Sequence, residues 1–147
     1  MVLAVAAIAT FAACGSAGSS EKTTLSPSEA TELGTQLING YWNTLSCDNS
    51  DSVTYESLLY PGFQSVSLAG PMTKDQVLAA LASKCFTSTE VKDIVVTSAP
   101  DTLVVSYKAR RTADGVQGPF QQLVNVFVKN GNEWDGVASA NAGNLPS

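Results

Sequence analysis

The chain has 147 residues, a formal net charge of −5 and no histidine. Its length suits one domain with a sizeable core, and its apolar fraction of 44% excludes a disordered chain. The acidic balance argues against nucleic-acid binding, which needs a basic surface. The lack of imidazole excludes Ser-His-Asp and Cys-His catalysis and most transition-metal sites, so we expect no metal and no cofactor.

A run of 12 apolar or small residues, Val2 to Ala13, opens the chain. It is shorter than the roughly 20 residues that span a bilayer and has the length of a signal-peptide core. The run ends in Phe11-Ala12-Ala13-Cys14, which resembles a lipobox, and a Gly/Ser-rich tether follows. The alternatives are an ordinary signal peptide cleaved nearby or a hydrophobic anchor, because no basic segment precedes the run.

These features predict three segments: a signal peptide at 1–13, a lipidated Cys14 with a tether at 14–25, and a folded domain at 26–147. The domain is expected to be exported and held by its lipid at the outer face of the cytoplasmic membrane, as part of the cell envelope.

Three helices are predicted in the first half of the domain. Ser26-Pro27-Ser28-Glu29 is a capping box that begins a helix ending near Ser46. A short helix follows an acidic link at 48–51, which lacks the Gly and distal Glu of an EF-hand and is interpreted as a helix cap. Residues 63–68 alternate as a strand, and a second capping box at 73–76 begins a helix ending near Lys84.

Beyond residue 89 the apolar period becomes two, which predicts strands at 90–97, 102–112, 120–129 and 133–140. Asp114-Gly115 and Asn130-Gly131 mark hairpin turns. Helices followed by strands indicate an α+β fold, with three helices packed on one face of a curved antiparallel sheet. A basic cluster of Lys108, Arg110 and Arg111 is interpreted as a solvated strand edge.

Cys47 and Cys85 remain once Cys14 is set aside. An even number of cysteines in an exported chain predicts a disulfide, which would join the ends of two helices. Two buried free thiols are the alternative.

The order of the elements and several short motifs resemble the nuclear-transport-factor-2-like superfamily, which includes ketosteroid isomerase and the SnoaL-like cyclases. The motifs are Tyr41–Leu45, Leu58–Phe63, Gly70–Lys74, Val124–Val128 and Asn130–Trp134. The resemblance implies a cone-shaped half-barrel, of the cystatin-like α+β kind, with a pocket at its open end.

The isomerase branch of this superfamily uses a tyrosine, a carboxylate base and a protonated acid. In this chain the resemblance places the tyrosine at Tyr41, the base position at or near Ser67 and the late acid at Asn125. Neither Ser67 nor Asn125 has a pKa suited to a general base. No catalytic residue is therefore assigned.

The candidate residues for a ligand-binding pocket are Tyr41, Tyr55, Phe63, Ser67, Tyr107, Asn125 and Phe127. For the aromatic residues the alternative is a place in the core, since aromatic rings bury large areas. For Asn125 the alternative is an amide satisfied by a neighbour or facing solvent.

Three functions fit these observations. The first is a non-catalytic domain that binds a small apolar ligand or an envelope protein. The second is an isomerase or cyclase that uses Tyr41 and an acid such as Asp93 or Asp101. The third is an accessory subunit that forms a homodimer through its sheet.

Overall fold

The computed structural model describes residues 24–144, so the predicted leader and Cys14 lie outside the described residues. The described part contains three helices: α1 (Pro27–Asn43), α2 (Ser52–Ser57) and α3 (Lys74–Leu81). Its strands are β1 (Leu59–Ser67), β2 (Gly70–Thr73), β3 (Ser88–Ala99), β4 (Thr102–Ala113), β5 (Val116–Gln117), β6 (Gln121–Asn130) and β7 (Glu133–Asn144). Among these helices, none combines the length and the hydropathy that a bilayer crossing requires.

The helices begin where the sequence predicts. The Ser26 hydroxyl accepts from the Glu29 amide, and the Glu29 carboxylate accepts from the Ser26 amide at 2.9 Å. Thr73 and Gln76 form the same reciprocal pair at the start of α3. The Asp51 carboxylate accepts from two amides in the first turn of α2, which confirms the interpretation of the acidic link as a cap.

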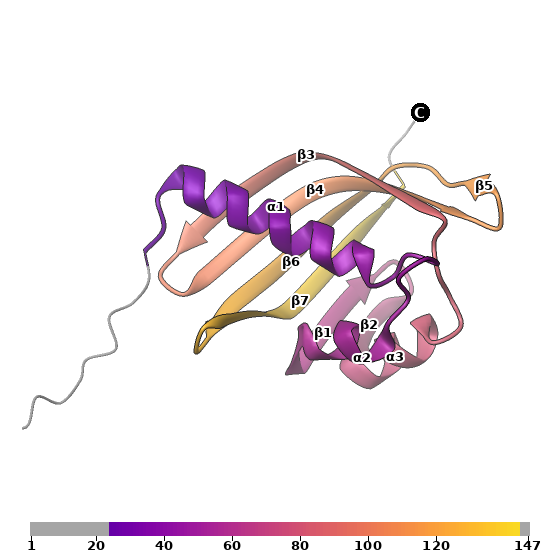
Figure 1. Cartoon of the computed structure of the whole chain (residues 1–147), viewed down its shortest axis with the longest axis horizontal. Coiled ribbons are helices and arrows are strands. Elements are labelled where there is room, and N and C mark those ends of the chain that lie inside the picture. The colour runs from indigo at the N-terminus through magenta and orange to yellow at the C-terminus, as the bar shows by residue number, and fades with distance from the viewer. Residues whose placement is uncertain (1–23, 145–147) are drawn as a thin grey trace, which may run out of the picture.

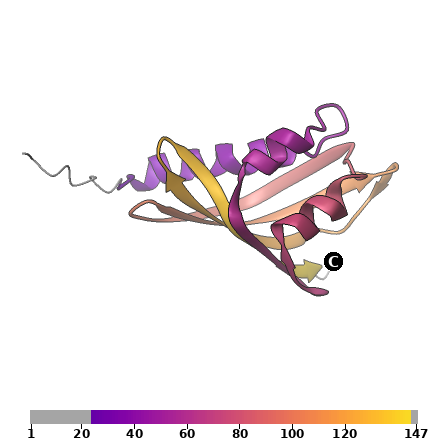
Figure 2. The ribbon, with the colours of Figure 1, turned by 90° about the horizontal axis from the view of Figure 1, so that it is seen from below.

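The strands form one curved sheet in the order β2-β1-β7-β6-β4-β3, with β5 paired to β4. Figures 1 and 2 show the sheet bending around α1, which packs against β3 and β4, while α3 packs against β1 and β2. The predicted α+β architecture of three helices on a curved sheet is confirmed. One pairing departs from the predicted antiparallel pattern, because β1 and β7 run parallel.

The core lies between α1 and the inner face of this sheet. Leu103, Val105 and Tyr107 point to the inner face of β4 and are fully buried. Their spacing of two residues along the strand predicts that they share a face. Asn125 and Phe127 of β6 are also buried on that face. Strand alternation therefore assigns the inner face correctly.

A disulfide joins Cys47 to Cys85, which confirms the predicted pairing over two free thiols. Beside it, the Cys47 amide donates to the Phe86 carbonyl at 3.0 Å, and the Phe86 amide donates to the Leu45 carbonyl at 2.9 Å. The bridge and these two bonds fix the segment after α1 against the segment that leads into β3.

Both predicted hairpins form. Asp114 and Gly115 both take positive φ, at 52° and 76°, as a tight two-residue turn requires. The hairpin predicted at Asn130-Gly131 joins β6 to β7, but Asn130 pairs with Glu133, so the two turn residues are Gly131 and Asn132. Gly131 supplies the positive φ there, at 62°.

Candidate binding cavity

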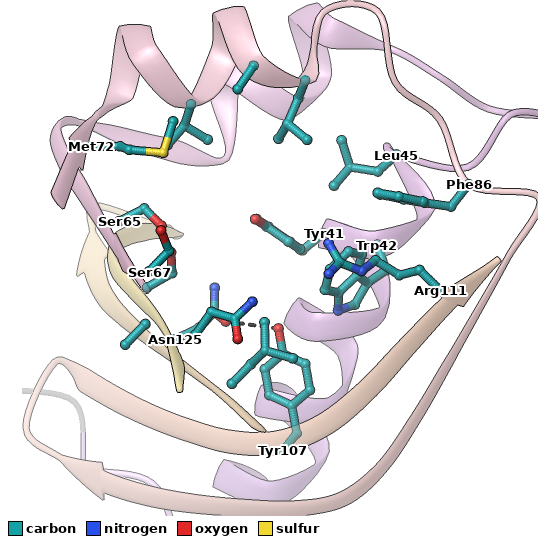
Figure 3. A pocket seen from close by; sticks show the side chains of 17 residues that line it. Tyr41, Trp42, Leu45, Ser65, Ser67, Met72, Phe86, Tyr107, Arg111 and Asn125 are labelled. Atoms are coloured by element: carbon teal, nitrogen blue, oxygen red, sulfur yellow. Dashed lines mark hydrogen bonds between the residues drawn. The ribbon is translucent and has the colours of Figure 1, made fainter. Parts of the chain in front are cut away.

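A cavity of about 210 Å³ lies between the end of α1, helix α3 and the inner face of the sheet (Figure 3). Its apolar wall comes from Trp42, Leu45, Met72, Val77, Ala80, Leu81, Phe86, Leu123 and Ala140. Its polar groups come from Tyr41, Ser65, Ser67, Tyr107, Arg111, Asn125, Ser139 and Asn141. An apolar enclosure with a few convergent polar groups is typical of a small-molecule site.

Four of the predicted pocket residues meet in this cavity: Tyr41, Ser67, Tyr107 and Asn125. Tyr55 instead lines a second cavity of about 300 Å³ beside α2 and α3. A hydrogen bond of 2.9 Å between the Tyr41 and Tyr55 hydroxyls joins a residue that lines the first cavity to one that lines the second. Phe63 and Phe127 belong to the buried core and do not line the first cavity.

Asn125 is buried, and its Oδ1 accepts a hydrogen bond of 2.9 Å from the Tyr107 hydroxyl (Figure 3). The amide thus faces the cavity and is also satisfied by a neighbouring side chain. Burial raises the pKa of Tyr107 and that of Tyr41 above the ordinary tyrosine value. Both phenols are therefore neutral at physiological pH.

Arg111 provides the positive charge of the cavity. It was expected on a solvated strand edge with Lys108 and Arg110, but β4 lies inside the sheet between β3 and β6, and Arg111 faces the cavity. Lys108 pairs with Asp93 at 2.9 Å, and Arg110 pairs with Glu90. The reason is the strand period of two, which turns residues 107 and 111 of β4 to the inner face.

Aromatic rings hold the Arg111 guanidinium in place. Its central carbon lies 5.6 Å from the Trp42 ring centre and 5.2 Å from the Phe86 ring centre. Its Nη2 donates to the Gln121 side-chain oxygen. Desolvation lowers the pKa of this guanidinium from its usual value, yet an arginine remains charged in proteins.

Trp42 contributes its ring to the cavity wall, whereas its Nε1–H is turned away from the cavity space. The residue is 7% exposed, and its Nε1–H makes no hydrogen bond of standard geometry with any described residue. The Tyr107 hydroxyl is the polar group beside it, because the indole N–H lowers the pKa of that phenol, although burial raises this pKa overall.

The described residues that line the cavity include no Asp or Glu. At the position that the resemblance gives to the base, the Ser67 hydroxyl accepts from the Ala69 amide at 3.2 Å and is occupied locally. The two acids considered as substitutes lie elsewhere: Asp93 is exposed and paired with Lys108, and Asp101 sits in the turn between β3 and β4. Neither of them lines the cavity.

No protein-family model and no curated protein sequence matches this chain. Solved structures do match it. They include a nuclear-transport-factor-2-like protein from Cytophaga hutchinsonii, with a TM-score of 0.67, 17% identity and coverage of 75% of this chain and 94% of the other.

A protein of the same fold from Pseudomonas putida, described as of unknown function, has a TM-score of 0.68 and 14% identity over 84% of this chain and 92% of the other. One from Rhodospirillum rubrum, described as of unknown function in nutrient uptake, has a TM-score of 0.61 and 21% identity over 78% and 98%. At these identities the likeness shows a shared fold.

Proposed function

Because the chain folds as a nuclear-transport-factor-2-like domain, we propose that it is a ligand-binding domain carried outside the cytoplasm on a lipid anchor at Cys14. In this proposal the cone cavity holds a small molecule without transforming it, and the anchor keeps the loaded domain at the membrane surface.

One observation carries the binding role. Among the described residues, the cavity combines a largely apolar wall with hydroxyl, amide and guanidinium groups, and it contains no carboxylate. Hydrogen-bond donors without a general base suit the recognition of a ligand. Proton abstraction needs a group whose pKa lies near the working pH and which lies within hydrogen-bond reach of the proton.

Native mass spectrometry of the protein purified from its own host tests the binding role. We expect a monomer that carries a small molecule, and we expect that molecule to be lost on denaturation. A stable homodimer with no bound molecule would instead favour the accessory function and contradict the proposal.

A matched pair of variants places the ligand in the cavity. Ser65 lines it, and the next residue, Val66, is 50% exposed on the other face of β1. Ser65→Phe should fill the cavity and abolish the co-purifying mass, while Val66→Phe should retain it. Far-UV circular dichroism would confirm that both variants fold.

The anchor is tested separately by Cys14→Ser, since the thiol is the site of lipidation. We expect the variant to leave the membrane fraction for the soluble fraction. Unchanged membrane association would rule out the lipid anchor and leave the binding role untouched.

A further inference from the structure

We propose that the ligand is a compact monocarboxylate with an apolar body, and that Arg111 binds its carboxylate. This inference rests on the proposed binding function and specifies the chemistry of the same cavity.

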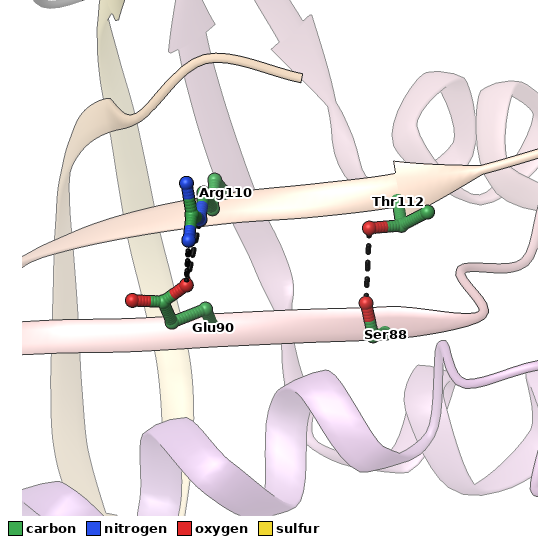
Figure 4. Close-up of polar contacts among 4 residues, drawn as sticks. All are labelled: Ser88, Glu90, Arg110 and Thr112. Carbon is green, nitrogen blue, oxygen red and sulfur yellow. Dashed lines mark hydrogen bonds and ion pairs between the residues drawn. The ribbon is translucent and has the colours of Figure 1, made fainter. Parts of the chain in front are cut away.

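The first step is the position of Arg111. Arg110 and Arg111 are neighbours on β4, but their side chains leave opposite faces of the sheet. Figure 4 shows Arg110 with Glu90 of β3, where Nε and the carboxylate oxygen are 2.6 Å apart. Arg111 instead lines the cavity and stacks on Trp42 and Phe86. Its orientation is therefore set before any ligand arrives, which lowers the entropic cost of binding.

The second step is charge. Lys108 and Arg110, the other cations of β4, each pair with a carboxylate, whereas the polar partner of Arg111 is the neutral amide of Gln121. Tyr41 and Tyr107, the phenols near Arg111, have pKa values raised by burial and so carry no compensating charge. A guanidinium has five N–H donors, and Gln121 uses one of them. A partly buried cation with free donors and no counter-charge is best satisfied by an anion.

The third step is that Arg111 is the donor available to a bound molecule. The Nε1–H of Trp42 is buried and lies beside the Tyr107 hydroxyl, so a molecule in the cavity does not reach it. Trp42 acts through its ring, which holds Arg111 in place. The charged donors of Arg111 favour a ligand that presents oxygen acceptors and a negative charge.

The fourth step is size and polarity. A cavity of about 150 Å³ holds benzene, so 210 Å³ holds on the order of eight to ten non-hydrogen atoms. A single guanidinium balances a single negative charge, which favours a monocarboxylate over a phosphate dianion or a dicarboxylate. The apolar wall suits a short hydrocarbon body.

Hexanoate and its neutral counterpart hexanamide test the inference, because they differ in charge but hardly in shape. Binding to the whole protein is measured by isothermal titration calorimetry and by the shift in melting temperature. We expect hexanoate to bind about 10- to 100-fold more tightly than hexanamide, the range expected for hydrogen bonds to a charged group.

Three variants separate charge from packing. Arg111→Gln should remove the preference for the carboxylate, Arg111→Lys should retain part of it, and the matched control Arg110→Gln should leave it unchanged. Equal binding of hexanoate by Arg111→Gln and Arg111→Lys would overturn the role assigned to the charge.

The outcomes also separate this inference from the proposed function. If the wild-type protein binds both probes equally, the carboxylate inference fails and the binding function stands. If it binds neither probe yet co-purifies with a small molecule, the carboxylate inference again fails alone. If it binds neither and carries no molecule, both proposals fail.

Discussion

At the scale of single residues, the polar groups of the cavity come in pairs whose members belong to different elements. Tyr107 of β4 donates to Asn125 of β6, and the Ser139 hydroxyl of β7 donates to Ser65 of β1 at 2.9 Å. Each pair satisfies groups that would be costly to bury alone, and it also ties two strands together at the cavity wall.

Tyr107→Phe tests the cost of breaking such a pair. The substitution leaves the Asn125 carbonyl oxygen buried without its donor, so the free energy of unfolding should fall by about 1–3 kcal/mol. Tyr60 is 43% exposed and provides the control, since Tyr60→Phe should change the free energy of unfolding by less than about 0.5 kcal/mol. Urea denaturation measures both. Equal effects would show that the hydrogen bond adds nothing to stability.

Part of the cavity could be predicted from the sequence. The resemblance placed Tyr41, Ser67 and Asn125 around one pocket, and all three line it. Arg111 was missed because its two basic neighbours suggested a solvated cluster, although its separation of four from Tyr107 puts both on one face of a strand. Strand alternation identifies which residues face inward, but it does not say how deeply each lies beneath the cavity surface. For this reason the buried Phe127 could not be distinguished from a residue that lines the cavity.

At the scale of elements, helix α1 and the sheet approach each other closely at Gly34. A Cβ atom there would lie 2.7 Å from a Val96 methyl group and 3.1 Å from a Val105 methyl group. The absence of a side chain on this turn of α1 allows the helix to lie directly on β3 and β4.

Two substitutions in α1 should therefore have opposite effects. Gly34→Ala should lower the free energy of unfolding by about 1–2 kcal/mol, since overpacking outweighs the gain in helix propensity. Gly40→Ala meets no atom within 4 Å and should raise it by about 0.5–1 kcal/mol. Thermal or urea unfolding distinguishes them. A stabilised Gly34→Ala variant would mean that the sheet yields easily at this contact.

The disulfide gives a third test. Replacing both Cys47 and Cys85 by Ser releases a loop with a sequence separation of 38 and should cost about 4 kcal/mol in the loop-entropy model. Addition of a reductant should weaken the wild-type protein by a similar amount and leave the double variant unchanged. A wild-type protein whose urea-unfolding midpoint does not change on addition of a reductant would contradict this expectation.

The elements that the sequence failed to predict are short or interrupted. β2 has four residues and β5 has two, and their extended form depends on pairing with β1 and β4. Pro61-Gly62 suggested a break, yet β1 begins at Leu59. The register of the pairing between β1 and β7 shifts between Leu59 and Gln64. Pro61 lies in this interruption, where the strand pairing needs no backbone N–H from it.

At the scale of the whole molecule, stability should depend on pH at the two extremes. The pKa values of Glu29, Asp51 and Asp93 lie below their usual 4.5, 3.8 and 3.8, mainly through hydrogen bonds to Ser26, Thr54 and Lys108. A lowered carboxyl pKa adds stability above its unfolded value and loses it as the pH falls. Burial raises the pKa of the phenols of Tyr41, Tyr55 and Tyr107, so their contribution is present below the usual 10.0 and is lost as the pH rises.

With no histidine to titrate between these limits, the free energy of unfolding should be flat from about pH 6 to 9 and fall on both sides. Urea denaturation across pH 3 to 11 measures the profile. Asp51→Asn retains an acceptor for the α2 cap, but it should reduce the fall in the free energy of unfolding at acid pH. A transition near pH 7 would be inconsistent with these groups.

The position of β7 has a consequence for how the chain reaches its final form. β7 is the last strand of the described chain, yet it lies inside the sheet and joins β1 to β6. Until β7 has formed, the β1–β2 hairpin cannot join the part of the sheet made by β6, β4 and β3. The cavity has walls on both sides of that seam, so it is among the last features to form.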